Sequence, residues 1–402
     1  MTEVFTGSFT QQDPLPPAAI EAANAVMRSG RLHRYNLTEG EVGEAALLES
    51  EFAAFTGARH CVAVASGGQA MAIALRATGV APGTPVLTNA FTLAPVPGAI
   101  AAVGGQPVFV GTTEALTIDL DDLAAKIATT KARHLLLSHM RGHIADMDAL
   151  MTICDGAGVT VIEDCAHTMG ADWNGTPSGR HGAMACYSTQ TYKHINSGEG
   201  GLLTTDDPDL AAKAVLMSGS YMLYAHHGTA PAPEVFEAHR YDTPNMSARM
   251  DHLRAAILRP QIPLLPERRA AWNALYAAVE DGLRGLNQLA LIDRDPREGF
   301  VASSIQWRLP DWPTTAIEAL IAACATRGVA LKWFGAATPT GFTSRHSHWH
   351  YANPEPLPKT EAILSTLIDM RLPLTFTTED AALIVGIIAD EVRNQTPPQP
   401  HH

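Results

Sequence analysis

The 402-residue chain is poor in basic residues and lacks any long uninterrupted hydrophobic run. It has 28 Lys and Arg against 41 Asp and Glu, which gives a formal net charge of −13. A protein that binds duplex nucleic acid needs a dense basic face, and the sequence has no run rich in Lys and Arg. A membrane span needs roughly 18 apolar residues, whereas the richest stretch, 94–103, is interrupted by Pro95, Pro97 and Gly98. We therefore expect neither nucleic acid nor a membrane as a partner.

Cysteines are also scarce. The chain has five, an odd number with no C-x-x-C pair, at Cys61, Cys154, Cys165, Cys186 and Cys324. This pattern argues against a zinc ribbon and against a disulfide scaffold. The first residues do not have the basic-then-apolar order of a signal peptide. We expect a soluble, reduced, cytoplasmic protein.

What is present is a regular alternation of apolar runs with helical patterns, in a chain that is 46% hydrophobic. The runs are continuously apolar rather than alternating, as in strands that are buried on both faces. We expect strands near residues 60–65, 84–87, 107–110, 134–137 and 159–162. With helical segments between them, these strands predict an α/β fold with a mostly parallel sheet between layers of helices.

The alternation ends near Gly219 and is followed by a polar stretch, 220–245, and a helical region, about 250–285. Residues beyond 300 resemble a smaller α+β unit with a closing helix near 379–393. We therefore predict three parts. An N-terminal arm and large α/β domain span 1–260, an interdomain helix and small C-terminal α+β domain span 261–395, and a disordered tail spans 396–402.

Candidate functional residues follow the predicted strands, where ligands of parallel sheets bind. Ser66-Gly67-Gly68-Gln69 stands between a strand and a helix, where backbone N–H groups can hold a phosphate, although a plain turn has the same appearance. Asp164 ends an apolar strand, where it could also be a helix cap or an ion-pair partner. His167 by itself would suit a structural role.

Lys193 lies in a stretch of hydroxyl, apolar and glycine residues, 186–201. A desolvated lysine loses its proton more readily and attacks aldehydes, whereas an isolated lysine is commonly a solvated surface residue. In chain order, a phosphate turn, a strand-end Asp, a hydroxyl and a lysine are the groups that pyridoxal 5'-phosphate requires. The turn holds the phosphate, the Asp keeps the ring nitrogen protonated, and the lysine forms the Schiff base.

These motifs resemble the DegT/DnrJ/EryC1/StrS group of fold-type-I pyridoxal-phosphate enzymes, best known as sugar aminotransferases. The resemblance runs from about residue 15 to 392 and is densest in 163–167, in 187–193 and in 198–201. It implies a large domain built on a mostly parallel sheet and a smaller C-terminal α+β domain. It also implies that Lys193 forms the Schiff base, that Asp164 binds the ring nitrogen, and that His167 lies by the phenolic oxygen.

The resemblance further implies a phosphate site and a partner. The residues that would hold the phosphate are Gly67, Gly68, Gln69 and Ser188. The segment 244–250 resembles the stretch that reaches the neighbouring subunit's phosphate site, with Asn245, Ser247 and Arg249 all open as the contact. A homodimer with shared active sites is therefore expected.

Two positions depart from the family pattern. Leu93 stands where an aromatic residue often stacks on the cofactor ring, and Arg141 stands where the family usually has an aromatic residue. Arg141 follows a predicted strand, so it could receive a substrate carboxylate; the alternative is an ion pair with Asp146 or Asp148. We also regard His139 as a candidate substrate contact.

Three histidines at alternate positions, His346, His348 and His350, would share one face of a strand. Neither a carboxylate nor a cysteine accompanies them in the sequence, and the family uses no metal. We expect a loop at the mouth of the substrate site and no metal ion.

The sequence thus predicts an aminotransferase that moves an amino group from an amino-acid donor to a keto acceptor, either a nucleotide-linked keto sugar or a small keto acid. Related enzymes that dehydrate their substrate often have His in place of the lysine, so Lys193 favours transamination. The alternatives are another pyridoxal-phosphate reaction on an amino acid, either an elimination or an aldol-type step, and a regulator that binds the cofactor without turnover.

Overall fold

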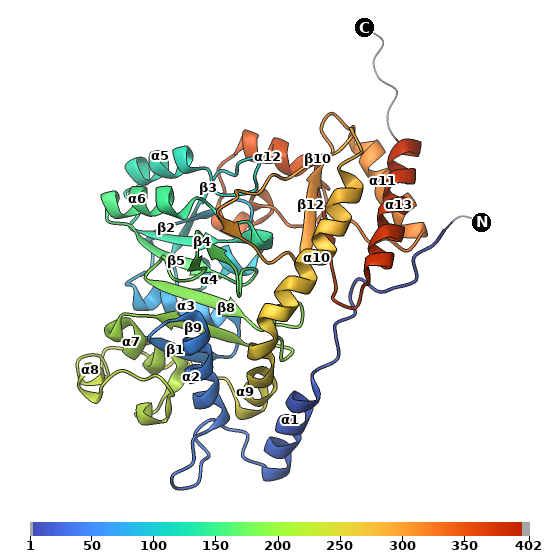
Figure 1. Ribbon diagram of the computed structural model, residues 1–402. Helices are drawn as coiled ribbons and strands as arrows, with labels where there is room; N and C mark the ends of the chain where they lie inside the picture. Colours follow the sequence, from blue (N-terminus) through green and yellow to red (C-terminus); the bar gives the residue numbers. More distant parts are fainter. Residues whose placement is uncertain (1–2, 396–402) are drawn as a thin grey trace.

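The computed structural model describes residues 3–395, and they form two main sheets and one small one (Figure 1). The central sheet has seven strands in the order β1-β9-β8-β5-β4-β2-β3. Its strands are β1 (His60–Val64), β2 (Pro85–Asn89), β3 (Gln106–Val110), β4 (His134–Ser138), β5 (Thr160–Asp164), β8 (Met184–Ser188) and β9 (Gly201–Thr205). Only β9 runs antiparallel to its neighbours, so the predicted mostly parallel sheet is confirmed.

Helices cover both faces of this sheet, which explains why its strands are continuously apolar. On β1, Val62 and Val64 face a core shared with α3 (Gly67–Ala77), α4 (Pro95–Ala102) and α7 (Pro208–Gly219). The alternate residues Cys61 and Ala63 face the other side, which is covered by α2 (Glu44–Thr56) and α9 (His252–Leu258). Farther along that side lie α5 (Leu120–Thr130) and α6 (Met147–Ala157).

The second sheet is antiparallel, with strands in the order β10-β12-β14-β13. They are β10 (Ala290–Leu291), β12 (Ser304–Arg308), β13 (Lys332–Trp333) and β14 (Leu367–Arg371). Helices α10 (Leu265–Leu283), α11 (Thr314–Thr326) and α13 (Thr378–Gln395) pack on it, at the upper right of Figure 1. The expected boundary near residue 260 falls in the 3-10 segment η3 (Arg259–Leu264), between the two sheets.

The start of the N-terminal arm packs on the core of the C-terminal part of the chain. The rings of Phe5 and Phe9 each lie 5.0 Å from the ring of Phe376, and all three belong to the core under the second sheet. Figure 1 shows the arm running from α1 (Pro17–Ser29) alongside α13. Three isolated aromatic side chains carry no periodic pattern, so this contact could not be predicted from the sequence.

Short elements complete the chain. A three-stranded sheet joins β6 (Asp172–Trp173), β7 (Thr176–Pro177) and β11 (Glu298–Gly299). The polar stretch 220–245 contains η2 (Tyr224–His226) and α8 (Pro233–Glu237), and α12 (Pro358–Ser365) precedes β14. The histidine cluster lies in two 3-10 turns, η4 (His346–His348) and η5 (His350–Ala352), rather than on the strand that a shared histidine face would need.

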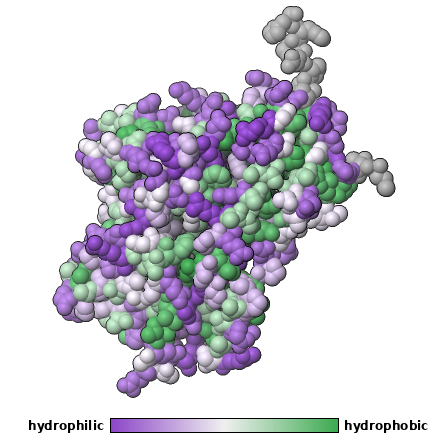
Figure 2. All heavy atoms as spheres, in the orientation of Figure 1, coloured by the Kyte–Doolittle hydropathy of each residue, from purple (hydrophilic) through white to green (hydrophobic). Residues whose placement is uncertain are grey.

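Among the described residues, no helix is long and apolar enough to cross a membrane. Hydrophilic and hydrophobic residues are interspersed over the face shown in Figure 2. The predicted disordered tail, 396–402, lies outside the described residues.

Candidate active site

A cavity of about 490 Å³ opens where the carboxyl ends of β4, β5 and β8 approach the second sheet. Residues from β13 and β14 complete its wall. Its lining includes these predicted site residues: Gly67, Gly68, Arg141, Asp164, His167, Ser188 and Lys193. Leu93 lines it too. The fold thus gathers candidates that are spread over more than a hundred residues of sequence.

Lys193 lies in the loop after β8, and its Nζ is 2.9 Å from Nε2 of His167. Burial, together with the nearby guanidinium groups of Arg141 and Arg371, lowers the pKa of Lys193 to about 8 against the opposing effect of Asp164. A lysine with this pKa is partly unprotonated near neutral pH, which is the form that attacks a carbonyl.

His167 reinforces this state of the lysine. Its Nδ1 accepts a hydrogen bond from the backbone N–H of Arg141 at 3.3 Å. Burial, with Lys193 and Arg141 nearby, holds the pKa of His167 well below its usual range, so the ring is neutral. A neutral ring that accepts at Nδ1 carries its proton on Nε2, and that proton points to Lys193. Both contacts are therefore hydrogen bonds when Nζ is unprotonated.

Asp164 is the last residue of β5 and is 7% exposed. The hydroxyl of Ser138 donates to its Oδ2 at 3.1 Å, and the backbone N–H of Ala166 donates to its Oδ1 at 3.2 Å. Burial raises the pKa of Asp164, and the neighbouring Lys193 opposes that change. Each carboxylate oxygen retains a lone pair, so the group can accept a further N–H from a ligand in the cavity.

The predicted phosphate turn forms the N-terminus of α3. The N-cap Ser66 accepts a hydrogen bond from the backbone N–H of Gln69 at 3.1 Å. The N–H groups of Gly67 and Gly68 lie in the first turn, where a helix offers no acceptor, so they suit an anion. A Cβ on Gly67 would lie 2.9 Å from Cβ of Ser188, so glycine allows this close approach to β8. These groups fit a cofactor phosphate.

Gln69 does not share this arrangement. Its side chain is exposed, its backbone N–H is already bound to Ser66, and it does not line the cavity. Its predicted part in phosphate binding stays a prediction.

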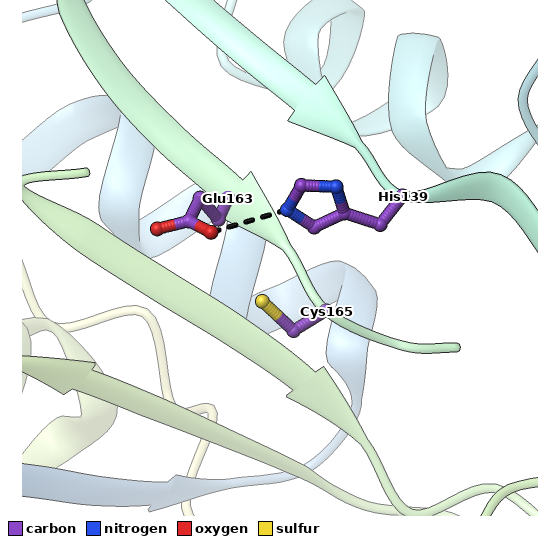
Figure 3. Close-up of side chains that lie close together, drawn as sticks. All are labelled: His139, Glu163 and Cys165. Atoms are coloured by element: carbon purple, nitrogen blue, oxygen red, sulfur yellow. Dashed lines mark hydrogen bonds and ion pairs between the residues drawn. The ribbon is translucent and has the colours of Figure 1, made fainter. Parts of the chain in front are cut away.

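His139 lies beneath the cavity rather than in it. Figure 3 shows His139 beside Glu163 and Cys165, and its Nε2 is 3.1 Å from Oε2 of Glu163. The carboxylate of Glu163 also accepts backbone N–H groups of Gly179, His181 and Gly182 at 2.8–2.9 Å. His139 is buried, pairs with Glu163 and does not line the cavity, which suits a structural role, and its predicted contact with substrate stays a prediction.

The trio in Figure 3 also has the residue types of a metal site, with ligand atoms within 4.8 Å of one another. The hydrogen bonds of Glu163 argue against a metal ion. Its carboxylate already pairs with His139 and accepts N–H groups from the loop at 179–182. The cluster fastens the loop to β5.

Arg141 lines the cavity, and neither of its expected ion pairs forms. Asp146 instead pairs with Arg297 at 2.9 Å, and Asp148 accepts a hydrogen bond from Nε1 of Trp173 at 3.1 Å. The guanidinium of Arg141 lies 2.9 Å from Oδ2 of Asp369 on β14.

Sequence reasoning missed Lys332 and Arg371, which β13 and β14 bring to this cavity wall. It also missed Asp369 on β14, which pairs with Arg141 and does not itself line the cavity. They come from short strands of alternating polarity in the C-terminal part of the chain, where a polar residue gives no sign of facing a site.

The segment predicted to reach a neighbouring subunit does not line the cavity of its own chain. Oδ1 of Asn245 accepts the backbone N–H of Ser247 at 2.9 Å. Arg249 donates to the carbonyl of Gly219 at 3.1 Å. Any contact of Asn245 or Arg249 with a cofactor would therefore be made in a second copy of the chain, and it stays a prediction.

The fold and the site together define the class: a fold-type-I transferase with a lysine at the end of its central sheet. The sequence model of the DegT/DnrJ/EryC1/StrS aminotransferase family matches residues 17–389, so the chain belongs to that family. It is an aminotransferase.

The named relatives include a regulatory protein and a transaminase. The chain is 33% identical to a pleiotropic regulatory protein of Geobacillus stearothermophilus, over 67% of this chain and 68% of that one. It is 33% identical to dTDP-3-amino-3,4,6-trideoxy-alpha-D-glucose transaminase of Streptomyces venezuelae, over 60% of this chain and 61% of that one. DesV of S. venezuelae, solved in complex with a ketimine intermediate, superposes with a TM-score of 0.78 at 27% identity, covering 95% of each chain.

Proposed function

We propose that the protein binds pyridoxal 5'-phosphate and moves an amino group from an amino-acid donor to a keto acceptor, either a nucleotide-linked keto sugar or a small keto acid. The observation that carries the proposal is the buried Nζ of Lys193, which shares one cavity with Asp164 and the N-terminus of α3. Relatives that act on sugars support the first acceptor class.

Each group of the cofactor has a matching set of residues. The N–H groups of Gly67 and Gly68 and the hydroxyl of Ser188 would hold the phosphate. The carboxylate of Asp164 would hold the protonated ring nitrogen. Lys193 would hold the aldehyde carbon covalently, with His167 beside it. When bound, the cofactor withdraws electrons from the substrate carbon that exchanges the amine.

The residues then have distinct tasks. In the protein without cofactor, burial and the nearby cations lower the pKa of Lys193 to about 8, so its free amine could both take and give a proton near neutral pH. His167 holds Nζ in place through its Nε2. Asp164 keeps its charge opposite the ring nitrogen, because Ser138 and Ala166 donate to it. This set of residues favours transamination over an elimination, an aldol-type step or a regulator without turnover.

We also propose a homodimer with shared active sites. Arg249 lies 5.0 Å from the ring of Tyr221, which is 62% exposed, and the adjacent Met222 is 51% exposed. Large exposed apolar side chains beside a cationic segment suit a surface that a second copy covers. A cytoplasmic location fits the five cysteines, which are all buried and unpaired.

A donor half-reaction tests the proposal. The purified protein, loaded with cofactor and offered a panel of amino acids without acceptor, should release about one keto acid per site and retain the amine on the cofactor. Sustained release of keto acid without acceptor would instead indicate elimination. Borohydride reduction and peptide mapping should place the pyridoxyl group on Lys193, and a different lysine would overturn the assignment.

A further inference from the structure

Three cationic side chains gather on the wall of the cavity that the second sheet completes. Arg141 comes from η1 (Met140–Gly142), Lys332 from β13, and Arg371 from the end of β14, and all three line the cavity. They face one buried carboxylate, Asp369, whose Oδ2 is 2.9 Å from the guanidinium of Arg141. Lys332 and Asp369 are paired residues of the two strands.

This group carries more positive than negative charge. Oδ1 of Asp369 already accepts a hydrogen bond from Gln306 at 2.7 Å. Within residues 3–395, neither Lys332 nor Arg371 forms an ion pair, so three cations and one carboxylate leave two positive charges in excess. Among the described residues, the carboxylates that line the cavity are Asp164, which lies near Lys193, and Glu199, which is exposed.

The excess charge is partly removed from water. Burial and the neighbouring cations Arg141 and Arg371 together lower the pKa of Lys332 to about 8. Burial and Arg141 also lower the pKa of Arg371. Desolvated cations without counterions destabilise a fold unless an anion joins them. The arrangement therefore suits a ligand that brings negative charge.

The guanidinium groups have fixed positions and free N–H donors for such a ligand. The contact of Arg141 with Asp369 is not aligned as a hydrogen bond, and Nε of Arg141 also has no acceptor among the described residues. The backbone of Arg141 has φ +57°, in the left-handed region, where a non-glycine residue stays only if its surroundings impose it. The guanidinium carbon of Arg371 lies 3.9 Å from the ring centre of Tyr192.

The cations lie near the reacting lysine and apart from the phosphate turn. Both Arg141 and Arg371 lower the pKa of Lys193, and the backbone of Arg141 is joined to Nζ of Lys193 through His167. The phosphate turn comes from other elements, the N-terminus of α3 and the end of β8. An anion bound by the cations would therefore lie close to the substrate carbon that exchanges the amine.

We propose that Arg141, Lys332 and Arg371 form a subsite for a carboxylate carried at or next to the reacting carbon of the substrate. A planar guanidinium binds a carboxylate through two parallel N–H donors, and the ammonium of Lys332 adds a third point of contact. The inference rests on the proposed function, and it assigns the substrate class: amino acids as donors, and acids rather than neutral ketones as acceptors where the subsite serves both halves of the reaction.

The first experiment measures binding without chemistry. Malonate and glutarate, which carry two carboxylates and no amine, are titrated into the cofactor-loaded protein by calorimetry. Lys332→Met and Arg371→Gln should each weaken binding on the order of 10- to 150-fold, the usual effect of losing a charge-assisted pair. Lys359→Met, at an exposed position on α12, is the matched control and should bind as the unaltered protein does. Equal binding by Lys332→Met and Lys359→Met would overturn the subsite.

The second experiment compares single-turnover rates for an amino acid and for the amine left by its decarboxylation. The unaltered protein should prefer the amino acid, and Lys332→Met and Arg371→Gln should lose most of that preference while the cofactor spectrum stays unchanged. If the unaltered protein reacts equally with both amines, the subsite is wrong and the proposed function stands. If it reacts with neither while dicarboxylates still bind, the proposed function is wrong and the subsite stands.

A third experiment, on the acceptor half-reaction, shows whether the subsite binds the carboxylate of the donor alone or of both donor and acceptor. The amine-loaded protein is offered a keto acid and a neutral ketone of similar size. Loss of preference in both half-reactions of Arg371→Gln supports a subsite shared by donor and acceptor, and loss in the donor half alone supports a donor subsite. Unchanged preference in both halves overturns the proposal.

Discussion

At the scale of single residues, the character of Lys193 comes from its surroundings rather than from its neighbours in sequence. Burial, Arg141 and Arg371 disfavour the ammonium form of Lys193, and Asp164 favours it. The arginines come from β4's end and from β14, more than two hundred residues apart. A lysine in a glycine- and hydroxyl-rich stretch gives no indication of this balance.

The lowered pKa predicts a pH dependence. The apo-protein should take up pyridoxal 5'-phosphate at a rate that rises with pH and levels off above about 8, because only the unprotonated amine attacks the aldehyde. Arg371→Gln removes a cation that disfavours the ammonium, so the pKa of Lys193 rises and the inflection moves to higher pH. Stopped-flow absorbance measures the rate, and an inflection that stays in place would contradict this account.

A second prediction concerns Asp164. Asp164→Asn should fold with a Tm close to that of the unaltered protein, because the amide has nearly the same shape. Its oxygen can keep the backbone N–H of Ala166, and the Ser138 hydroxyl, which donates to the other carboxylate oxygen of Asp164, can turn to accept from the new NH₂. It should lose most turnover, since a neutral amide does not keep the ring nitrogen protonated. Steady-state rates with saturating cofactor test this, and full turnover would show that Asp164 is only structural.

At the scale of elements, the end of β5 has two tasks because adjacent strand residues point to opposite faces. Asp164 faces the cavity, and Glu163 faces the loop at 179–182, whose N–H groups it accepts. This loop leads into β8 and then to Lys193. One strand thus supplies a ligand group and fixes the approach to the next strand of the sheet.

Glu163→Gln tests the second task. Burial alone would raise the pKa of Glu163, but His139 and the loop N–H groups hold it below its usual value, so the group is ionised and its contacts stabilise the fold at neutral pH. An amide NH₂ facing those donors should lower the free energy of unfolding by about 1–3 kcal/mol. Urea unfolding measures the loss, and Glu318→Gln on the exposed face of α11 is the control. An equal free energy of unfolding for the two variants would contradict the role of Glu163 in holding the loop at 179–182 to β5.

Element prediction from the sequence worked where burial imposes a pattern. The central strands are apolar throughout because helices cover both faces, so β1, β2, β4 and β5 were predicted close to their observed bounds. At the histidine turns η4 and η5, alternation over a few polar residues left a strand and a loop both open, because it does not distinguish a strand from consecutive turns.

At the scale of the whole molecule, we predict that two copies share each active site. Mixing Lys193→Ala with Arg249→Met should restore activity to about a quarter of the unaltered level, because half of the dimers are hybrids with one intact site. Each variant alone is the control, and mass spectrometry of differently tagged chains confirms exchange. Exchange without any return of activity would show that each site is built within one chain.

The sequence alone determined the class of fold, the alternation of strands and helices along the chain, and the set of residues around Asp164 and Lys193. Burial and backbone geometry act locally, so they leave periodic or closely spaced signals in the sequence. The tertiary structure decided what lies across from those residues. His139 lies outside the cavity and pairs with Glu163, and Arg141 pairs with Asp369 in place of Asp146 or Asp148. The tertiary structure also brought Lys332 and Arg371 to the site. Contacts between side chains far apart in the chain depend on how two sheets pack, and no local pattern of residues records that packing.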